Sequence, residues 1–156
     1  MINKESPPII FLDVDGVLNF YHQSEYDTIN EGHYTLSKSR LDLFAKLIEQ
    51  TNAQIVLSST WRLYPTGKTF LRRQLYHRYD IQILDCTPDL KENYTTIFRI
   101  DEINKWLEYY ENKNVKWVVL DDCCIGQDVP NFFKTSYLTG IMQEDVDSVV
   151  SYLKNR

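Results

Sequence analysis

Residues 8–18 read Pro-Ile-Ile-Phe-Leu-Asp-Val-Asp-Gly-Val-Leu, an apolar run followed by two carboxylates and a glycine. An uninterrupted run such as Ile9–Leu12 is typical of a strand buried on both faces of a parallel sheet. Ligands of such sheets bind beyond the carboxyl ends of the strands, which is where Asp13 and Asp15 lie. Because side chains alternate along an extended chain, both carboxylates can face one point. Two like charges held so close favour a shared cation.

Two further apolar runs end in polar residues suited to the same site. Residues 53–57 stop at Ser58-Ser59-Thr60-Trp61-Arg62, and residues 115–120 stop at Asp121-Asp122. Both runs are short and rich in β-branched residues, as strands are. Because the carboxyl ends of parallel strands lie on one edge of the sheet, segments far apart in sequence converge there. The sequence therefore predicts one site built from three strand ends.

Strands and helices alternate along the chain. The apolar pattern predicts strands near residues 9–14, 54–58, 81–84, 116–120 and 135–138. It predicts helices near residues 37–51, 68–79, 100–111 and 143–154. This alternation indicates an α/β fold, a Rossmann-like doubly wound parallel sheet of about five strands. With 156 residues in all, we expect one domain over residues 1–156.

The composition limits the partners and the compartment. The formal net charge of −5 argues against non-specific coating of nucleic acid, which needs a broad basic surface. No stretch approaches the roughly 18 apolar residues of a membrane span, and residues 1–8 are polar rather than signal-like. Cys86, Cys123 and Cys124 are odd in number and two are adjacent, which is unlike a disulfide framework. We therefore expect a cytoplasmic protein without membrane contact.

The strand ends resemble the motifs of the haloacid dehalogenase-like (HAD) superfamily of hydrolases, over roughly residues 9–153. The string Asp13-Val14-Asp15-Gly16-Val17-Leu18 resembles the first motif, and Asp121-Asp122 resembles the fourth. Ser58 resembles the second motif, with Ser59 as the neighbouring alternative. The strings Asp-Val-Asp-Gly-Val-Leu-Asn and Ser-Ser-Thr-Trp-Arg also resemble the small HAD domains found in or beside RNA-repair proteins. The resemblance implies a five-stranded core with the Asp13 strand in the middle.

The third HAD motif is a single Lys or Arg near the start of a helix, which neutralises charge between nucleophile and phosphate. Arg99 is our choice, and Lys91 and Lys105 are the alternatives. The resemblance further implies that Asp13 is the nucleophile and Asp15 the general acid and base. The sequence thus predicts a HAD-like phosphatase.

The chemistry of these residues agrees with that implication. A carboxylate can attack phosphorus and form an aspartyl-phosphate. Mg²⁺ prefers oxygen ligands, and the expected ones are Asp13, the main-chain carbonyl of Asp15, Asp121 and Asp122. Ser58 and Arg99 would bind phosphoryl oxygens. Gly16 would let the chain turn and bring backbone N–H groups towards the phosphate.

The segments between the motifs bear on the substrate. HAD caps enclose small substrates, and here residues 20–34 form only a polar, aromatic flap. We therefore expect an open site, suited to a large or end-presented phosphate. Residues 62–79 are basic without an acid, which fits either a contact with a phosphate polymer or a solvated helix face. Arg62 fits either a substrate contact or an exposed structural arginine.

Three functions share these acids. The leading hypothesis is a Mg²⁺-dependent phosphohydrolase acting through an aspartyl-phosphate on Asp13, with a phosphorylated substrate such as a nucleic-acid terminus. The alternative is a non-catalytic or regulatory metal- or phosphate-binding domain, for which a general acid at Asp15 has no use. A third reading is a metal nuclease without a covalent intermediate. All three leave the oligomeric state open.

Overall fold

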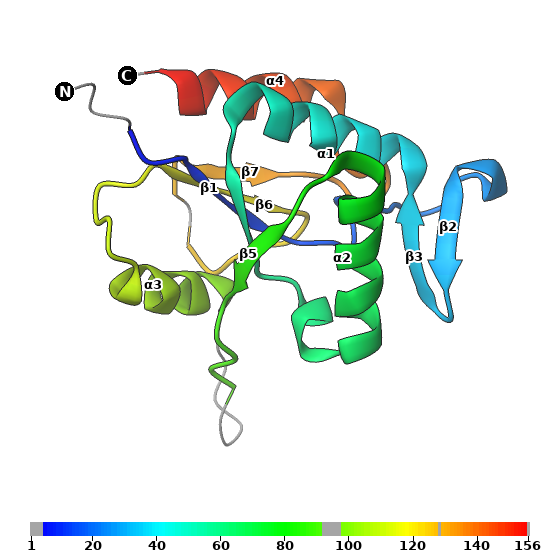
Figure 1. Ribbon diagram of the computed structural model, residues 1–156, viewed down its shortest axis with the longest axis horizontal. Coiled ribbons are helices and arrows are strands. Elements are labelled where there is room, and N and C mark those ends of the chain that lie inside the picture. The colour runs from blue at the N-terminus through cyan, green and yellow to red at the C-terminus, as the bar shows by residue number, and fades with distance from the viewer. Residues whose placement is uncertain (1–4, 92–97, 128, 156) are drawn as a thin grey trace.

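A five-stranded parallel sheet forms the centre of the computed structural model, which describes residues 5–91, 98–127 and 129–155 (Figure 1). Its strands, in spatial order, are β5 (Ile83–Cys86), β4 (Gln54–Leu57), β1 (Ile9–Leu12), β6 (Trp117–Asp121) and β7 (Phe132–Lys134). All neighbouring pairs run parallel. As predicted, the strand that precedes Asp13 is central. It ends at Leu12, so Asp13 is the first residue beyond the sheet.

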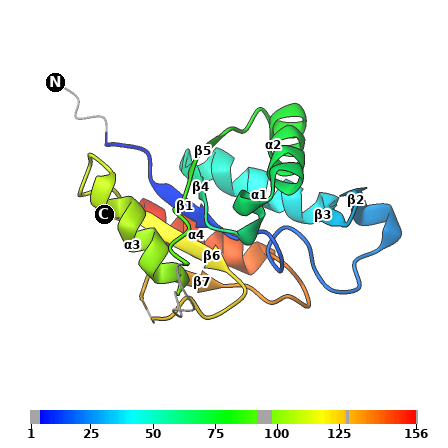
Figure 2. The same cartoon turned by 90° about the horizontal axis from the view of Figure 1, so that it is seen from below.

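Helices cover both faces of this sheet (Figures 1 and 2). They are α1 (Lys38–Thr51), α2 (Pro65–Tyr79), α3 (Arg99–Tyr109) and α4 (Gln143–Lys154). The alternation of β1 explains the two layers. Ile10 and Leu12 are buried in the core that α1, α2 and α4 share, while Ile9 and Phe11 are buried in a second core with α3. The α/β doubly wound prediction is confirmed.

The helix ends follow local chemistry. α1 begins after Ser37, whose Oγ accepts from the backbone N–H of Arg40 (3.3 Å), and it ends at Asn52 in the left-handed conformation. α2 begins at Pro65, three residues before the predicted start, because proline suits the first helical position. In the part of the chain that the structure describes, no helix combines the length and apolar character needed to cross a bilayer.

The flap expected at residues 20–34 is in part regular structure. After a 3₁₀ turn at Glu25–Asp27, β2 (Thr28–Glu31) and β3 (Tyr34–Ser37) form an antiparallel hairpin. Its turn contains Gly32 at φ +60°. The sequence pattern predicts only a flap without strands here, because the two strands are short and largely polar. Between the described ends of β1 and β4, this hairpin and α1 are the only elements longer than one turn, so no large cap covers the sheet edge.

The last strand was predicted in the wrong place. Residues 135–138 were expected to form it, but β7 is Phe132–Lys134. The predicted stretch turns instead, because the N–H of Gly140 donates to the carbonyl of Ser136 (2.7 Å). Leu138 is consequently exposed. The strand expected near residues 81–84 is shifted by two residues, to Ile83–Cys86.

Candidate active site

Three carboxylates meet at the carboxyl edge of the sheet. Asp13 follows β1, Asp121 ends β6, and Asp122 comes next. β1 and β6 are paired, with Leu12 opposite Leu120, so the two strand ends lie side by side. One carboxylate oxygen from each acid lies within 4.8 Å of the others. Oxygens that ligate Mg²⁺ at about 2.1 Å are about 3 to 4.2 Å apart, so these three are close to the required spacing.

The acids are crowded and poorly solvated. Asp13 is only 5% exposed. Its burial, together with the charge of Asp121, raises the pKa of Asp13 from 3.8 to about 8, although Arg99 acts in the opposite direction. Burial likewise raises the pKa of Asp122, and the charge of Asp121 adds to it. A bound cation would stabilise such a site, because its charge offsets both the cost of burying the ionised carboxylates and the repulsion between them.

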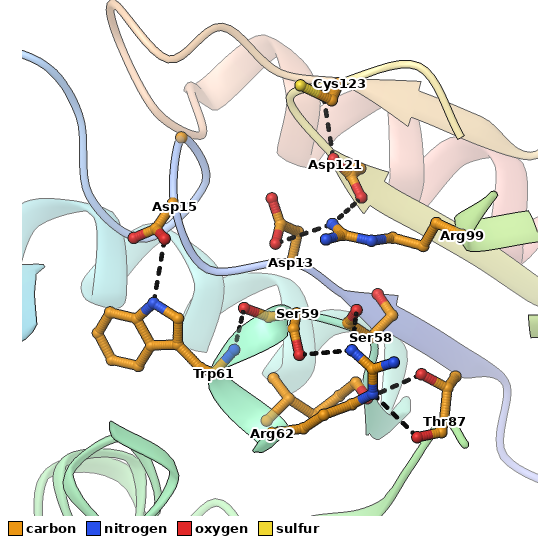
Figure 3. Close-up of polar contacts among 12 residues, drawn as sticks. Asp13, Asp15, Ser58, Ser59, Trp61, Arg62, Thr87, Arg99, Asp121 and Cys123 are labelled. Carbon is orange, nitrogen blue, oxygen red and sulfur yellow. Dashed lines mark hydrogen bonds and ion pairs between the residues drawn. The ribbon is translucent and has the colours of Figure 1, made fainter. Parts of the chain in front are cut away.

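Arg99 is the basic residue that contacts these acids (Figure 3). It is the first residue of α3, and its Nη1 lies 2.9 Å from Asp13 Oδ1 and also forms an ion pair with Asp121. Burial lowers the pKa of Arg99, but the charges of the two acids outweigh this effect and raise it above its ordinary value. Of the alternatives, Lys105 pairs with Glu108 (3.3 Å), away from the carboxylates. The geometry therefore favours Arg99 for the third motif.

Ser58 follows β4 and lies next to Asp13. Its N–H donates to the carbonyl of Leu12 (2.9 Å), which fixes the two strand ends against each other. The side chain is fully buried, and its Oγ has no hydrogen-bond partner among the described residues. Buried hydroxyls are nearly always paired, so an unused one beside three acids and an arginine indicates a group arranged for a ligand.

Ser59, the alternative for the second motif, has a structural task. Its Oγ accepts from the backbone N–H of Trp61 (3.1 Å) and caps the 3₁₀ turn η2 (Thr60–Leu63). The hydroxyl of Ser59 is thus already used in a local bond. Ser58 is the better candidate for binding a phosphoryl oxygen.

Arg62 has the structural role of one of its two predictions, but it is not exposed as that prediction had it, and its N–H groups are not free for the substrate contact of the other. Its side chain is 4% exposed and forms a buried ion pair with Glu102 of α3 (2.8 Å). The guanidinium also donates to four backbone carbonyls, those of Ser58, Ser59, Thr87 and Pro88. These bonds use every direction in which the group can donate. Arg62 therefore belongs to the scaffold, where it ties the end of β4 to α3.

This buried pair leads to a prediction about stability. Glu102→Ala should lower the free energy of unfolding by about 3–5 kcal/mol, because it leaves the Arg62 charge buried and unpaired. Glu31→Ala is the matched control, since Glu31 pairs with Arg73 at the surface, where both side chains are 44% exposed. The control should cost no more than about 1 kcal/mol. Urea denaturation measures both losses, and equal losses would contradict a structural role for the buried pair.

Gly16 makes room for the fourth motif. Its φ is +79°, and a Cβ at this position would lie 2.2 Å from Asp122 Oδ2. Its N–H donates to Asn19 Oδ1 (3.0 Å). The prediction that this N–H faces a phosphate is therefore wrong, because the N–H is already bonded within the protein. Gly16 permits the turn and the close approach of Asp122, and we do not assign it to phosphate binding.

Asp15 lies apart from the three acids. Its side chain is exposed, and its carboxylate accepts from Trp61 Nε1 (3.1 Å) (Figure 3) and from Asn19 Nδ2 (2.9 Å). A role for these two donors was not predicted from the sequence. Both occur in the two strings that resemble RNA-repair HAD domains, which was the one available signal. The side chain of Asp15 thus lies outside the group of three carboxylates that could hold a metal ion.

A small cavity opens beside the acids. It has a volume of about 200 Å³, and its lining includes Arg99, Asp121, Thr60, Lys91 and Cys123. A larger cavity of about 610 Å³ lies between α1 and the end of α2, but its lining contains none of the carboxylates, serines or arginines of the candidate site. The smaller cavity is the candidate ligand site, because Asp121 and Arg99 line it, whereas the larger cavity is chosen by volume alone.

Comparison with known proteins gives a match to a family model. A family model described as the HAD domain in Swiss Army Knife RNA repair proteins matches residues 9–146. No curated protein and no solved structure gives a significant match to the chain. The matched range begins with β1, ends within α4, and contains every residue assigned to the site above. HAD domains are generally hydrolases and typically use Mg²⁺. The chain therefore belongs to the family of HAD domains in Swiss Army Knife RNA repair proteins.

Proposed function

We propose that the protein is a Mg²⁺-dependent phosphomonoesterase that forms an aspartyl-phosphate on Asp13. One observation carries this proposal above the others: Ser58, whose backbone is bonded to the end of β1 just before Asp13, has a buried hydroxyl with no hydrogen-bond partner among the described residues. With Arg99, this hydroxyl offers donors for phosphoryl oxygens at the place where a carboxylate could attack. A plain cation site would need the acids but not a serine and an arginine set against them.

The chain also offers a fitting set of metal ligands. The carboxylates of Asp13, Asp121 and Asp122 supply oxygens, as a hard cation requires, and the main-chain carbonyl of Asp15 would add a fourth. When bound, Mg²⁺ would supply positive charge that neutralises the phosphoryl group and the crowded acids. Arg99 provides one positive charge against three carboxylates, so the site has an excess of negative charge that suits a divalent ion.

The residues then divide the reaction into two displacements. In the first, an Asp13 oxygen bonds to phosphorus while the bond from phosphorus to the leaving oxygen breaks, and Asp15 gives that oxygen a proton. In the second, Asp15 takes a proton from water as the water oxygen bonds to phosphorus. The bond to Asp13 breaks, which returns the carboxylate and releases phosphate. Ser58 and Arg99 hold the phosphoryl oxygens in both steps.

For the substrate we propose the terminal phosphate of a nucleic acid, with the cytoplasm as the place of action. The family occurs in RNA repair proteins, and a sheet edge without a large cap admits an end of a long chain. α2 follows the second motif after the turn η2, and it carries the exposed Arg72, with Arg73 half-exposed beside it. The three cysteines are free thiols, as is usual in a reducing compartment.

The experiment is a substrate panel with the purified chain. We expect Mg²⁺-dependent release of phosphate, lost on chelation and regained with Mg²⁺. An oligonucleotide with a terminal phosphate should have a higher kcat/KM than the matching mononucleotide. Arg72→Gln with Arg73→Gln should reduce that preference and its salt dependence, whereas Arg78→Gln, in the last turn of α2, should not. A mononucleotide hydrolysed equally well would favour a small-molecule phosphatase.

The panel also separates the other hypotheses. A non-catalytic domain would bind metal without releasing phosphate from any compound. A metal nuclease would cleave internal phosphodiester bonds and leave terminal phosphates in place. Activity restored by Zn²⁺ alone would contradict the oxygen-ligand set proposed for the metal.

Ser58 and Ser59 offer a matched pair of variants. Ser58→Ala should leave the free energy of unfolding within about 0.5 kcal/mol of the wild type, because the lost hydroxyl has no partner. It should nevertheless lower kcat/KM by about 10²-fold, as loss of one donor to a reacting oxygen does. Ser59→Ala should show the reverse, a cost of about 1 kcal/mol in stability from the lost cap. Phosphate release and urea denaturation measure the two effects, and the opposite pattern would assign phosphate binding to Ser59.

A further inference from the structure

The carboxylate of Asp15 is held at both oxygens. Oδ2 accepts from Trp61 Nε1 (3.1 Å) and Oδ1 accepts from Asn19 Nδ2 (2.9 Å) (Figure 3 shows the first of these). An exposed carboxylate on a loop normally rotates freely in water. Two N–H donors on different segments remove that freedom, because each fixes the direction of one oxygen.

Trp61 is itself fixed. Its side chain is 4% exposed, and its ring packs edge-on against Tyr34 of β3, with 5.0 Å between ring centroids. Tyr34 in turn lies against Gly67 of α2, where a Cβ would come within 2.6 Å of the tyrosine ring. Only a glycine leaves room for this contact. The indole N–H therefore points at Asp15 from a closely packed support.

Asn19 is fixed by two further bonds. Its Nδ2 also donates to the carbonyl of Thr35 in β3 (2.9 Å), and its Oδ1 accepts from the N–H of Gly16 (3.0 Å). Asn19 is buried, with 9% of its surface exposed. The same hairpin that packs on Trp61 thus also anchors Asn19.

From these contacts we infer that Trp61 and Asn19 are positioning residues that aim the Asp15 carboxylate, and that the β2–β3 hairpin is their support. The inference rests on the proposed function, in which Asp15 moves a proton. A proton-transfer group must lie within hydrogen-bond reach of the leaving oxygen, and small displacements are costly. The short insert between the first and second motifs then serves the general acid rather than covering the substrate.

Trp61→Phe tests the inference, because it keeps an aromatic ring and removes the N–H. With an alkyl phosphate, whose leaving oxygen needs a proton, kcat should fall by about 10-fold or more. With an aryl phosphate, a good leaving group, kcat should fall by less than about 3-fold. Loss of packing alone would lower both rates together.

Trp106→Phe is the matched control. Trp106 donates its Nε1–H to Asp85 Oδ2 (2.7 Å), so this variant also breaks a bond from indole to carboxylate, but in the core under α3. It should lower the melting temperature and leave the ratio of the two rates unchanged. If Trp61→Phe does not fold, Asn19→Ala gives the same test at the other oxygen.

The outcomes separate this inference from the proposed function. If the wild type releases phosphate from neither ester and from no oligonucleotide with a terminal phosphate, the proposed function fails. If Asp15→Asn shows the selective loss on the alkyl ester and Trp61→Phe and Asn19→Ala do not, the positioning role is overturned while the phosphatase stands. A selective loss in Trp61→Phe, absent in Trp106→Phe, supports the inference.

Discussion

Asp13→Asn is expected to lower kcat by at least about 10³-fold with saturating Mg²⁺, with the fold retained. The amide has the shape of the carboxylate but is a poor nucleophile, so the covalent route is closed. Asp13 also lies within the group of metal ligands, and the variant weakens that group as well. Both effects act in the same direction. Phosphate release under single-turnover conditions measures the loss.

Asp147→Asn is the control for this variant. It replaces an exposed aspartate of α4 by the same amide, and turnover should remain at the wild-type level. Circular dichroism would show whether Asp13→Asn is folded. Wild-type turnover by a folded Asp13→Asn protein would rule out attack by this carboxylate.

The second large effect concerns stability in the presence of a chelator. The pKa of Asp13 is about 8 in the folded protein, against an ordinary value of 3.8. Below pH 4 the folded and unfolded chains both hold this proton, and the contribution of Asp13 to stability is fully present. As the pH rises towards 8, only the unfolded chain loses the proton, so the contribution is lost. The metal-free protein should therefore lose on the order of a few kcal/mol between pH 4 and pH 8.

Comparison with Asp13→Asn isolates this effect from other titrating groups, such as Asp27, whose pKa is lowered and whose contribution has the opposite sign. At pH 8 with chelator, Asp13→Asn should melt at a higher temperature than the wild type, and at pH 4 the difference should vanish. Mg²⁺ should raise the melting temperature of the wild type more at pH 8 than at pH 5, because protons compete with the ion. Parallel pH curves for both proteins would contradict the strained acid group.

The parts of the site that were predictable follow from one local pattern. An apolar run that ends in Asp13 or in Asp121 predicts a buried strand with a polar residue at its end. Because the two strands pair in parallel, their carboxyl ends lie side by side and bring these acids together. The fold class was predictable from the alternation of strands and helices along the chain. β7 was misplaced because it has only three residues, Phe132–Lys134, and so carries little periodic signal.

The roles that were not predictable depend on contacts between distant segments. Nothing near Arg62 in the chain indicates that carbonyls after β5 and a carboxylate of α3 occupy its N–H groups. The bond between Trp61 and Asp15 spans 46 positions. That the Ser58 hydroxyl lacks a partner among the described residues is visible only in the folded structure, where the positions of its neighbours are known. Sequence patterns identify residue types at strand ends, whereas partners are decided by tertiary packing.

The proposed covalent intermediate on Asp13 can be trapped and detected directly. The wild type and Asp15→Asn would be incubated with Mg²⁺ and an aryl phosphate, quenched in acid, digested and analysed by mass spectrometry. We expect one phosphoryl group on the peptide that contains Asp13, and hydroxylamine should release it. More label is expected in Asp15→Asn, because the base for the second step is lost. Turnover by the wild type with no label on this peptide in either protein, or with the label on another residue, would contradict the account.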